Sequence, residues 1–180
     1  MLWLWIVLGV IGFLLLAMAV LHVLGKRLPE EHVARASVLL QQPRQAVWDV
    51  VSDIAGHKNW VKGLTGLERL PDRDNHEVWR QTMGRNAFVL VFTEKQPPER
   101  MVGTIDDEAQ FFSGRWEYVL KDEGGGTRLT LTEHGRVKLA IPRAMMEYMM
   151  GKDKFLKQHL RDLAARFNEP GAPIETGHPA

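Results

Sequence analysis

The stretch that decides the fold is residues 113–167, SGRWEYVLKDEGGGTRLTLTEHGRVKLAIPRAMMEYMMGKDKFLKQHLRDLAARF. Its first half alternates apolar with polar side chains around Gly124-Gly125-Gly126, which predicts two strands joined by a hairpin. In its second half, apolar residues recur at helical spacing, which predicts one long helix from Pro142 to about Phe167. The residues of this helical stripe are Met145, Met149, Leu156, Leu160, Leu163 and Phe167.

Upstream of this stretch, turn-forming residues separate further short strand-like segments. The pattern predicts strands at 32–40, 67–70, 77–83, 87–95 and 101–106, with a helix that begins near Pro43. Short connections between consecutive strands imply an antiparallel sheet. One apolar face of that sheet needs a cover, and the long C-terminal helix is the only sufficient one. The sequence therefore predicts an α+β fold in which a curved sheet surrounds this helix, with a space between them as the candidate site.

The N-terminal segment differs from the rest of the chain. Leu2 to Leu24 contains no charged residue, and its 23 residues would form a helix of about 34 Å, enough to cross a bilayer. Trp3 and Trp5 suit one membrane interface, and Lys26 and Arg27 after the run favour a cytoplasmic location for the domain that follows. A cleaved signal peptide, with Ala17-Met18-Ala19 at the cleavage site, is the alternative. An anchor is favoured because no Lys or Arg precedes the apolar run.

These patterns divide the chain into four parts. They are a single-pass transmembrane anchor (1–25), a linker (26–31), a soluble domain (32–167) and a disordered tail (168–180). The balance of 23 basic against 22 acidic residues argues against nucleic acid as a partner, and the absence of cysteine excludes thiol catalysis and cysteine-based metal sites. No metal site or cofactor is predicted, because His57, His76, His134 and His159 lack the spacing of a ligand set.

Three motifs of the soluble part resemble the START-like, or SRPBCC, superfamily, and in particular its polyketide cyclase/dehydrase-like branch. They are the segments PRQAVWDVVSD (43–53) with Trp60 downstream, FSGRWEY (112–118), and GTRLTLTE (126–133) leading to Gly135. The resemblance implies the helix-grip fold, in which an antiparallel sheet wraps around a C-terminal helix. It names no catalytic residue, because members that bind lipids, hormones, ubiquinone or polyketides look alike at this level.

Strand phase supplies most of the candidate ligand contacts. Trp116 and Tyr118 share one apolar phase of their strand, and Trp79 can point inward only if Gln81 and Met83 do so as well. The resemblance places Trp60 near the cavity mouth, whereas Trp48 is expected in the core. Met145 and Met149 would give the terminal helix an adaptable surface, although both are equally suited to filling the core. The candidate ligand-binding residues are Trp60, Trp79, Trp116, Tyr118, Leu131, Glu133, Met145 and Met149.

Glu133 is the most specific of these candidates. It shares a phase with Leu129 and Leu131, so in an unbroken strand its carboxyl group projects onto the buried face. There it could bind a ligand hydroxyl or carbonyl group, or act as a general acid. Alternatively, a bulge at Gly135 would leave Glu133 in solvent or paired with Arg115 or Arg136.

The leading functional hypothesis is a membrane-anchored domain that binds a hydrophobic small molecule, such as a lipid, an isoprenoid or an aromatic compound. The second is a cyclase or dehydratase that uses Glu133 or a nearby histidine as acid or base. The third is an interaction module whose own side chains fill the cavity. The volume and lining of the space beneath the terminal helix distinguish them.

Overall fold

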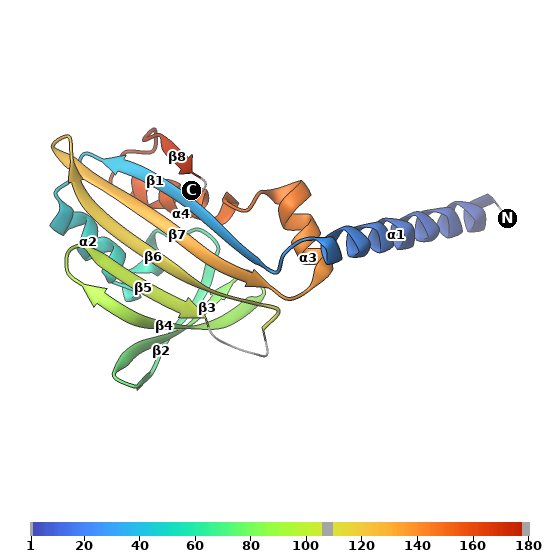
Figure 1. Cartoon of the computed structure of the whole chain (residues 1–180), viewed down its shortest axis with the longest axis horizontal. Coiled ribbons are helices and arrows are strands. Elements are labelled where there is room, and N and C mark those ends of the chain that lie inside the picture. The colour runs from blue at the N-terminus through green and yellow to red at the C-terminus, as the bar shows by residue number, and fades with distance from the viewer. Residues whose placement is uncertain (1, 106–109, 178–180) are drawn as a thin grey trace.

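The computed structural model describes residues 2–105 and 110–177 of the chain. Within these residues, eight antiparallel strands form one curved sheet in the order β2-β3-β4-β5-β6-β7-β1-β8 (Figure 1). Residue 106 of the predicted strand 101–106 lies outside the described residues. The strands are β1 (Glu31–Leu40), β2 (Leu64–Arg73), β3 (His76–Met83), β4 (Asn86–Gln96), β5 (Arg100–Ile105), β6 (Phe112–Glu123), β7 (Gly126–Val137) and β8 (Ile174–Gly177).

Two of the hairpins turn on residues with positive φ. Gly124 and Gly125 join β6 to β7 with φ of 58° and 84°, and Asp74 and Asn75 join β2 to β3 with φ of 52° and 62°. Two consecutive residues with positive φ produce the tight turn whose twist matches that of the flanking strands. The predicted hairpin between the last two long strands is confirmed.

The predicted long C-terminal helix is interrupted, and in this respect the prediction was wrong. Gly151 has a φ of 82° and its N–H donates to the Met146 carbonyl at 2.9 Å, so one helix ends before the next begins. A glycine adopts this left-handed conformation without steric cost, which makes it a natural helix end. The helices are α1 (Leu2–Arg27), α2 (Arg44–Ser52), the 3₁₀ turn η1 (Ala55–Asn59), α3 (Ala140–Met145), the π-helical turn η2 (Met146–Met150) and α4 (Lys154–Arg166).

The core lies between one face of the sheet and the two helices α2 and α4. Alternate residues of β1 from Ala34 to Leu40 are buried there, as the period of two predicts. Trp48 of α2 is buried, as expected. From α4, Leu156, Leu160 and Leu163 are completely buried against this cluster, so α4 is the part of the predicted helix that covers the sheet.

α1 projects away from the sheet, and its large apolar side chains are exposed (Figure 1). Only its C-terminal end contacts the rest of the molecule, chiefly α3. Gly25 allows this contact, because a Cβ at this position would lie 1.8 Å from the Ala140 carbonyl oxygen. Arg143 of α3 fixes the contact: its Nε donates to the Gly25 carbonyl at 3.1 Å, and its guanidinium also pairs with Glu30 at 3.1 Å.

The tail that the sequence predicted to be disordered over 168–180 contains β8, so the prediction was wrong for residues 174–177. β8 pairs with the free edge of β1 from Arg35 to Val38. Arg128 holds it there by pairing with Glu175 at 2.8 Å. Covering an edge strand satisfies backbone groups that would otherwise remain open to another chain. Residues 178–180 lie outside the described part of the chain.

Candidate functional site

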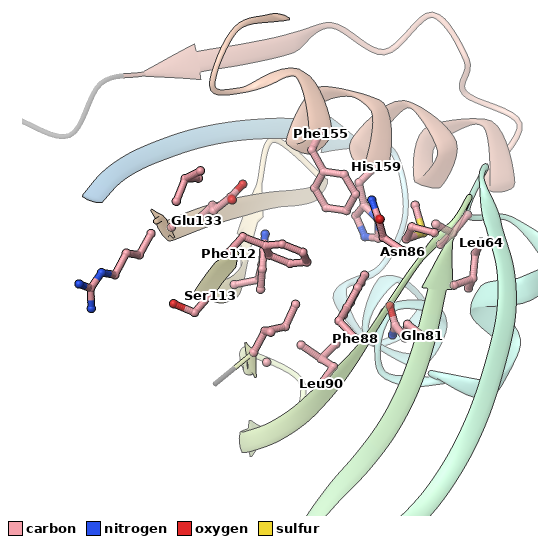
Figure 2. Close-up of a pocket in the computed structure, with 18 of the residues that line it drawn as sticks. Leu64, Gln81, Asn86, Phe88, Leu90, Phe112, Ser113, Glu133, Phe155 and His159 are labelled. Carbon is pink, nitrogen blue, oxygen red and sulfur yellow. The ribbon is translucent and has the colours of Figure 1, made fainter. Parts of the chain in front are cut away.

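A cavity of about 310 Å³ lies between the inner face of the sheet and α4. This volume is at the lower end of the range for small-molecule sites, about 300 to 1,000 Å³. Side chains from β3, β4, β6, β7 and α4 converge on it, as Figure 2 shows for Gln81, Phe88, Phe112, Glu133 and His159. Most of the lining is apolar: Val61, Leu64, Met83, Phe88, Leu90, Phe92, Ile105, Phe111, Phe112, Trp116, Val137, Met146 and Phe155.

Polar groups occupy one end of the cavity, where β1 begins and β7 ends. His32 Nε2 lies 3.6 Å from Glu133 Oε1, and their side chains are only 5% and 14% exposed. Glu133 is directly opposite Trp116 in the pairing of β7 with β6, so the two side chains project from the same face. We call His32, Trp116 and Glu133 the polar cluster.

Glycine makes room for the imidazole of the polar cluster. His32 is paired with Gly135 across β1 and β7, and a Cβ on Gly135 would lie 2.3 Å from His32 Cε1 and 2.6 Å from Nε2. No side chain larger than hydrogen fits there while the ring keeps its position. β7 continues through Gly135 to Val137 without a register shift, so the bulge considered for this position is not formed.

A second set of polar groups lies beneath α4. The Tyr118 hydroxyl and His159 Nε2 are hydrogen-bonded at 3.2 Å, and the His57 Nε2–H donates to the Val51 carbonyl at 2.9 Å. The rings of His57 and His159 flank Trp60, with ring centroids 4.8 and 5.0 Å from its own. These three rings form an aromatic cluster beneath α4, in which His57 and Trp60 meet edge to face.

Burial controls the ionisation of this second set. Desolvation, with a smaller repulsion from His57, lowers the pKa of His159 from 6.5 to about 3. Desolvation also lowers the pKa of His57, although its hydrogen bond to Val51 opposes the shift. Burial raises the pKa of the Tyr118 hydroxyl above its ordinary value. At neutral pH, His159 and Tyr118 are therefore uncharged and offer a ligand neutral hydrogen-bonding groups.

Three of the sequence-predicted site residues line the cavity: Trp116, Tyr118 and Glu133. Glu133 faces the interior, as the phase argument predicted, and its nearby basic group is His32. Neither of the two arginines considered as its partners pairs with Glu133: Arg136 lines the cavity but its guanidinium pairs with Glu30 at 2.9 Å, and Arg115 is exposed.

Three other candidates pack beside the cavity and are absent from its lining. Trp60 contacts His57 and His159, both of which line it. Trp79 shares an inward phase with Gln81 and Met83, as the sequence required, but it is buried in the core and its Nε1–H donates to Glu77 at 2.7 Å. Leu131 is completely buried in the same core.

The two methionines predicted as ligand contacts lie on the segment where the C-terminal helix is interrupted. Met145 belongs to α3 and Met149 to η2, and neither lines the cavity. Met149 is 69% exposed. Met146 is the methionine of this segment that reaches the lining.

Sequence reasoning missed several of the polar residues that line the cavity, among them His32 and His159. His32 precedes Ala34 by two residues and so shares the inward phase of β1. His159 lies three residues after Leu156 and four before Leu163, on the buried stripe of α4. Both were recognisable from spacing, but His32 was not considered as a candidate, and His159 was considered only as a metal ligand or base. Within residues 2–105 and 110–177, no group of three or more acidic or histidine side chains is placed to hold a metal ion.

Comparison with known proteins agrees with this geometry. Residues 31–168 match the family described as polyketide cyclase/dehydrase and lipid transport. No curated protein matches the chain.

Solved structures similar to the chain include two aromatase/cyclases and one START protein. The Zhui aromatase/cyclase from Streptomyces sp. R1128 has a TM-score of 0.65 at 16% identity, over 77% of this chain and 94% of its own. A START superfamily protein from Mycobacterium smegmatis gives 0.64 at 16% identity, over 77% and 98%. The di-domain StfQ of the steffimycin pathway gives 0.63 at 9% identity, over 78% and 52%. At these identities the likeness establishes a shared helix-grip fold.

Proposed function

Since the chain belongs to the polyketide cyclase/dehydrase and lipid transport family, we propose that it binds a hydrophobic small molecule in the cavity beneath α4. The compound classes that suit it are lipids, isoprenoids and aromatic molecules. The observation that carries the proposal is the cavity itself, which is lined mostly by aromatic and aliphatic side chains with a few polar groups among them. Such a lining removes apolar ligand surface from water while a few polar groups fix the ligand's orientation.

The proposal includes a membrane anchor formed by α1. Residues Trp3–Arg27 form the one helix among the described residues that is long and apolar enough to cross a bilayer. Lys26 and Arg27 follow the apolar run, which favours a cytoplasmic location for the domain. Anchoring would keep the cavity close to a supply of membrane-soluble ligand.

A cavity-filling variant tests the binding proposal. Leu64 lines the cavity, so Leu64→Trp places an indole where the ligand would lie, whereas Leu70→Trp makes the same change elsewhere on β2. The full chain is extracted into lipid nanodiscs, and bound compounds are identified by native mass spectrometry. We expect a co-purifying apolar compound in the wild type and in Leu70→Trp, and at least about tenfold less in Leu64→Trp. Identical ligand-free spectra for all three proteins would contradict the proposal.

A cyclase or dehydratase activity is the second candidate function. The proximity of His32 Nε2 to Glu133 Oε1 favours it, because an acid/base pair inside an apolar cavity could move a proton on a bound ligand. Incubation of the recovered ligand with the protein would then yield a product lighter by one water if the reaction is a dehydration, or an isomer of the same mass with a different chromatographic retention time if it is a cyclisation. Glu133→Gln would abolish this conversion. An unchanged mass together with an unchanged retention time would leave binding as the function.

A further inference from the structure

We propose that the polar cluster, His32, Trp116 and Glu133, binds the hydroxyl group of a neutral apolar ligand, which is an alcohol or a phenol. This inference rests on the proposed function and specifies the ligand class that the same cavity would accept.

The first argument is that buried polar groups of the cluster are unsatisfied. Among the residues that the structure describes, both ring nitrogens of His32 and the Trp116 indole nitrogen are buried and have no hydrogen-bond partner in the protein. A buried donor or acceptor without a partner destabilises the folded protein, and proteins seldom leave such groups unpaired. Two side chains of one cavity wall carry these groups, and both line the cavity.

The second argument is the spacing of His32 and Glu133. Their nearest nitrogen and oxygen atoms are 3.6 Å apart, which is beyond hydrogen-bond length, so they do not satisfy each other. Both groups can instead bond to one oxygen atom placed between them and the cavity. Trp116, opposite Glu133 on the neighbouring strand, adds an N–H donor from the same face.

The third argument is the chemistry of these groups, which selects a hydroxyl. The Trp116 N–H can only donate, so the ligand must offer an acceptor, while the Glu133 carboxylate accepts and requires a donor. A hydroxyl group supplies both. A ligand carboxylate or phosphate would place a second negative charge beside Glu133, and the nearby guanidinium of Arg136 is paired with Glu30. A ligand ammonium would leave Trp116 without an acceptor.

Three probes that differ only in one substituent test this inference: 2-naphthol, naphthalene and 2-naphthoate. Binding to the full chain in nanodiscs is measured by fluorescence and corrected with empty nanodiscs. We expect 2-naphthol to bind at least about tenfold more tightly than naphthalene or 2-naphthoate. Trp116→Phe and Glu133→Gln should each remove most of the preference for 2-naphthol over naphthalene. Trp79→Phe, which removes an indole N–H that pairs with Glu77 away from the cavity, should leave that preference unchanged.

The outcomes separate this inference from the proposed function. If 2-naphthol and naphthalene bind with equal affinity, the proposed hydroxyl site is overturned, and water would then satisfy the polar cluster. If Leu64→Trp weakens the binding of both probes in that case, the proposal of an apolar ligand cavity remains supported. Tighter binding of 2-naphthoate would also overturn the hydroxyl site. Failure of all three probes to bind would contradict both proposals. The comparison of the three probes uses the wild-type protein alone. The inference can therefore be contradicted even if a variant fails to fold.

Discussion

At the scale of single residues, the cavity holds groups whose ionisation is set by burial. His159 is 6% exposed, and desolvation lowers its pKa to about 3. The hydrogen bond to the Tyr118 hydroxyl keeps its ring in place beneath α4. A buried imidazole of this kind links the stability of the fold to pH.

The first prediction concerns this link. Above about pH 6.5, His159 is neutral in both the folded and the unfolded chain and adds no pH dependence. Below that value, the unfolded chain takes up a proton that the folded chain does not accept until about pH 3. The free energy of unfolding should therefore fall as the pH falls, by about 1.4 kcal/mol per pH unit from His159 alone. His57, whose pKa is also lowered, acts in the same direction.

Denaturant unfolding of the full chain at several pH values measures this slope. His159→Gln should reduce the slope by the amount that corresponds to one proton, about 1.4 kcal/mol per pH unit. His134→Gln, which changes an exposed histidine of β7, should leave the slope unchanged. Equal slopes in the wild type and in His159→Gln would show that His159 takes up its proton in the folded state.

Sequence phase was sufficient to place Glu133 but not to find its neighbour. Along β7 the alternation continues to Glu133 without a bulge, so the inward direction of its side chain followed from Leu129 and Leu131. The contact with His32 depends on the register of β1 against β7, between residues about a hundred positions apart. No local pattern specifies that register, although the phase of His32 was visible within its own strand.

At the scale of elements, the two parts of the interrupted C-terminal helix, α3 and α4, pack against different parts of the molecule. α4 buries its leucines against the sheet, while α3 packs against the end of α1. The joint between α3 and α1 depends on a glycine and a buried arginine, Gly25 and Arg143. Any side chain at position 25 must push the two helices apart.

The second prediction tests this joint. Gly25→Ala should lose the hydrogen bond from Arg143 to the carbonyl of residue 25 and destabilise the docking of α3 by about 1–3 kcal/mol. Hydrogen exchange of the α3 amides in nanodiscs reports this loss as faster exchange. Gly12→Ala is the matched control, because a Cβ there has no atom within 4 Å. Unchanged exchange in Gly25→Ala would mean that α3 and α1 are not held by this contact.

The strands were predictable because alternation and turn residues are local signals. The interruption of the C-terminal helix was not, since Met146 to Met150 has strong helix formers and the apolar spacing continues across Gly151. β8 escaped prediction for a different reason. Its residues have little apolar alternation, and they become a strand by pairing with the open edge of β1.

At the scale of the whole molecule, α1 and the cavity are connected through α3 and η2. The side chains of Tyr148, Met149 and Met150 in η2 are exposed. η2 follows directly after α3, which packs against the end of α1 (Figure 1). If α1 spans a bilayer, we expect these side chains to lie near its surface. Exposed aromatic and apolar residues beside an anchor are typical of membrane contact.

The third prediction tests this orientation. The chain has no cysteine, so Met149→Cys creates a single site for an environment-sensitive fluorophore. In nanodiscs, we expect its emission to be blue-shifted and quenched by lipids brominated near the headgroup. Thr93→Cys, exposed on the outer face of the sheet, should show neither effect. Equal quenching at the two sites would exclude a membrane position for η2.

The polar cluster lies at the end of the cavity nearest to α1, because His32 is at the start of β1, the strand that follows that helix, and Glu133 is in the second half of β7. In a lipid leaflet, an amphiphile keeps its head at the water surface and its tail among the acyl chains. With its head held by Glu133, the same molecule would extend its tail in the opposite direction, away from the leaflet. Each molecule would therefore have to reverse its orientation end to end as it passes from the leaflet into the cavity. The rate of uptake should consequently depend on the length and stiffness of its tail.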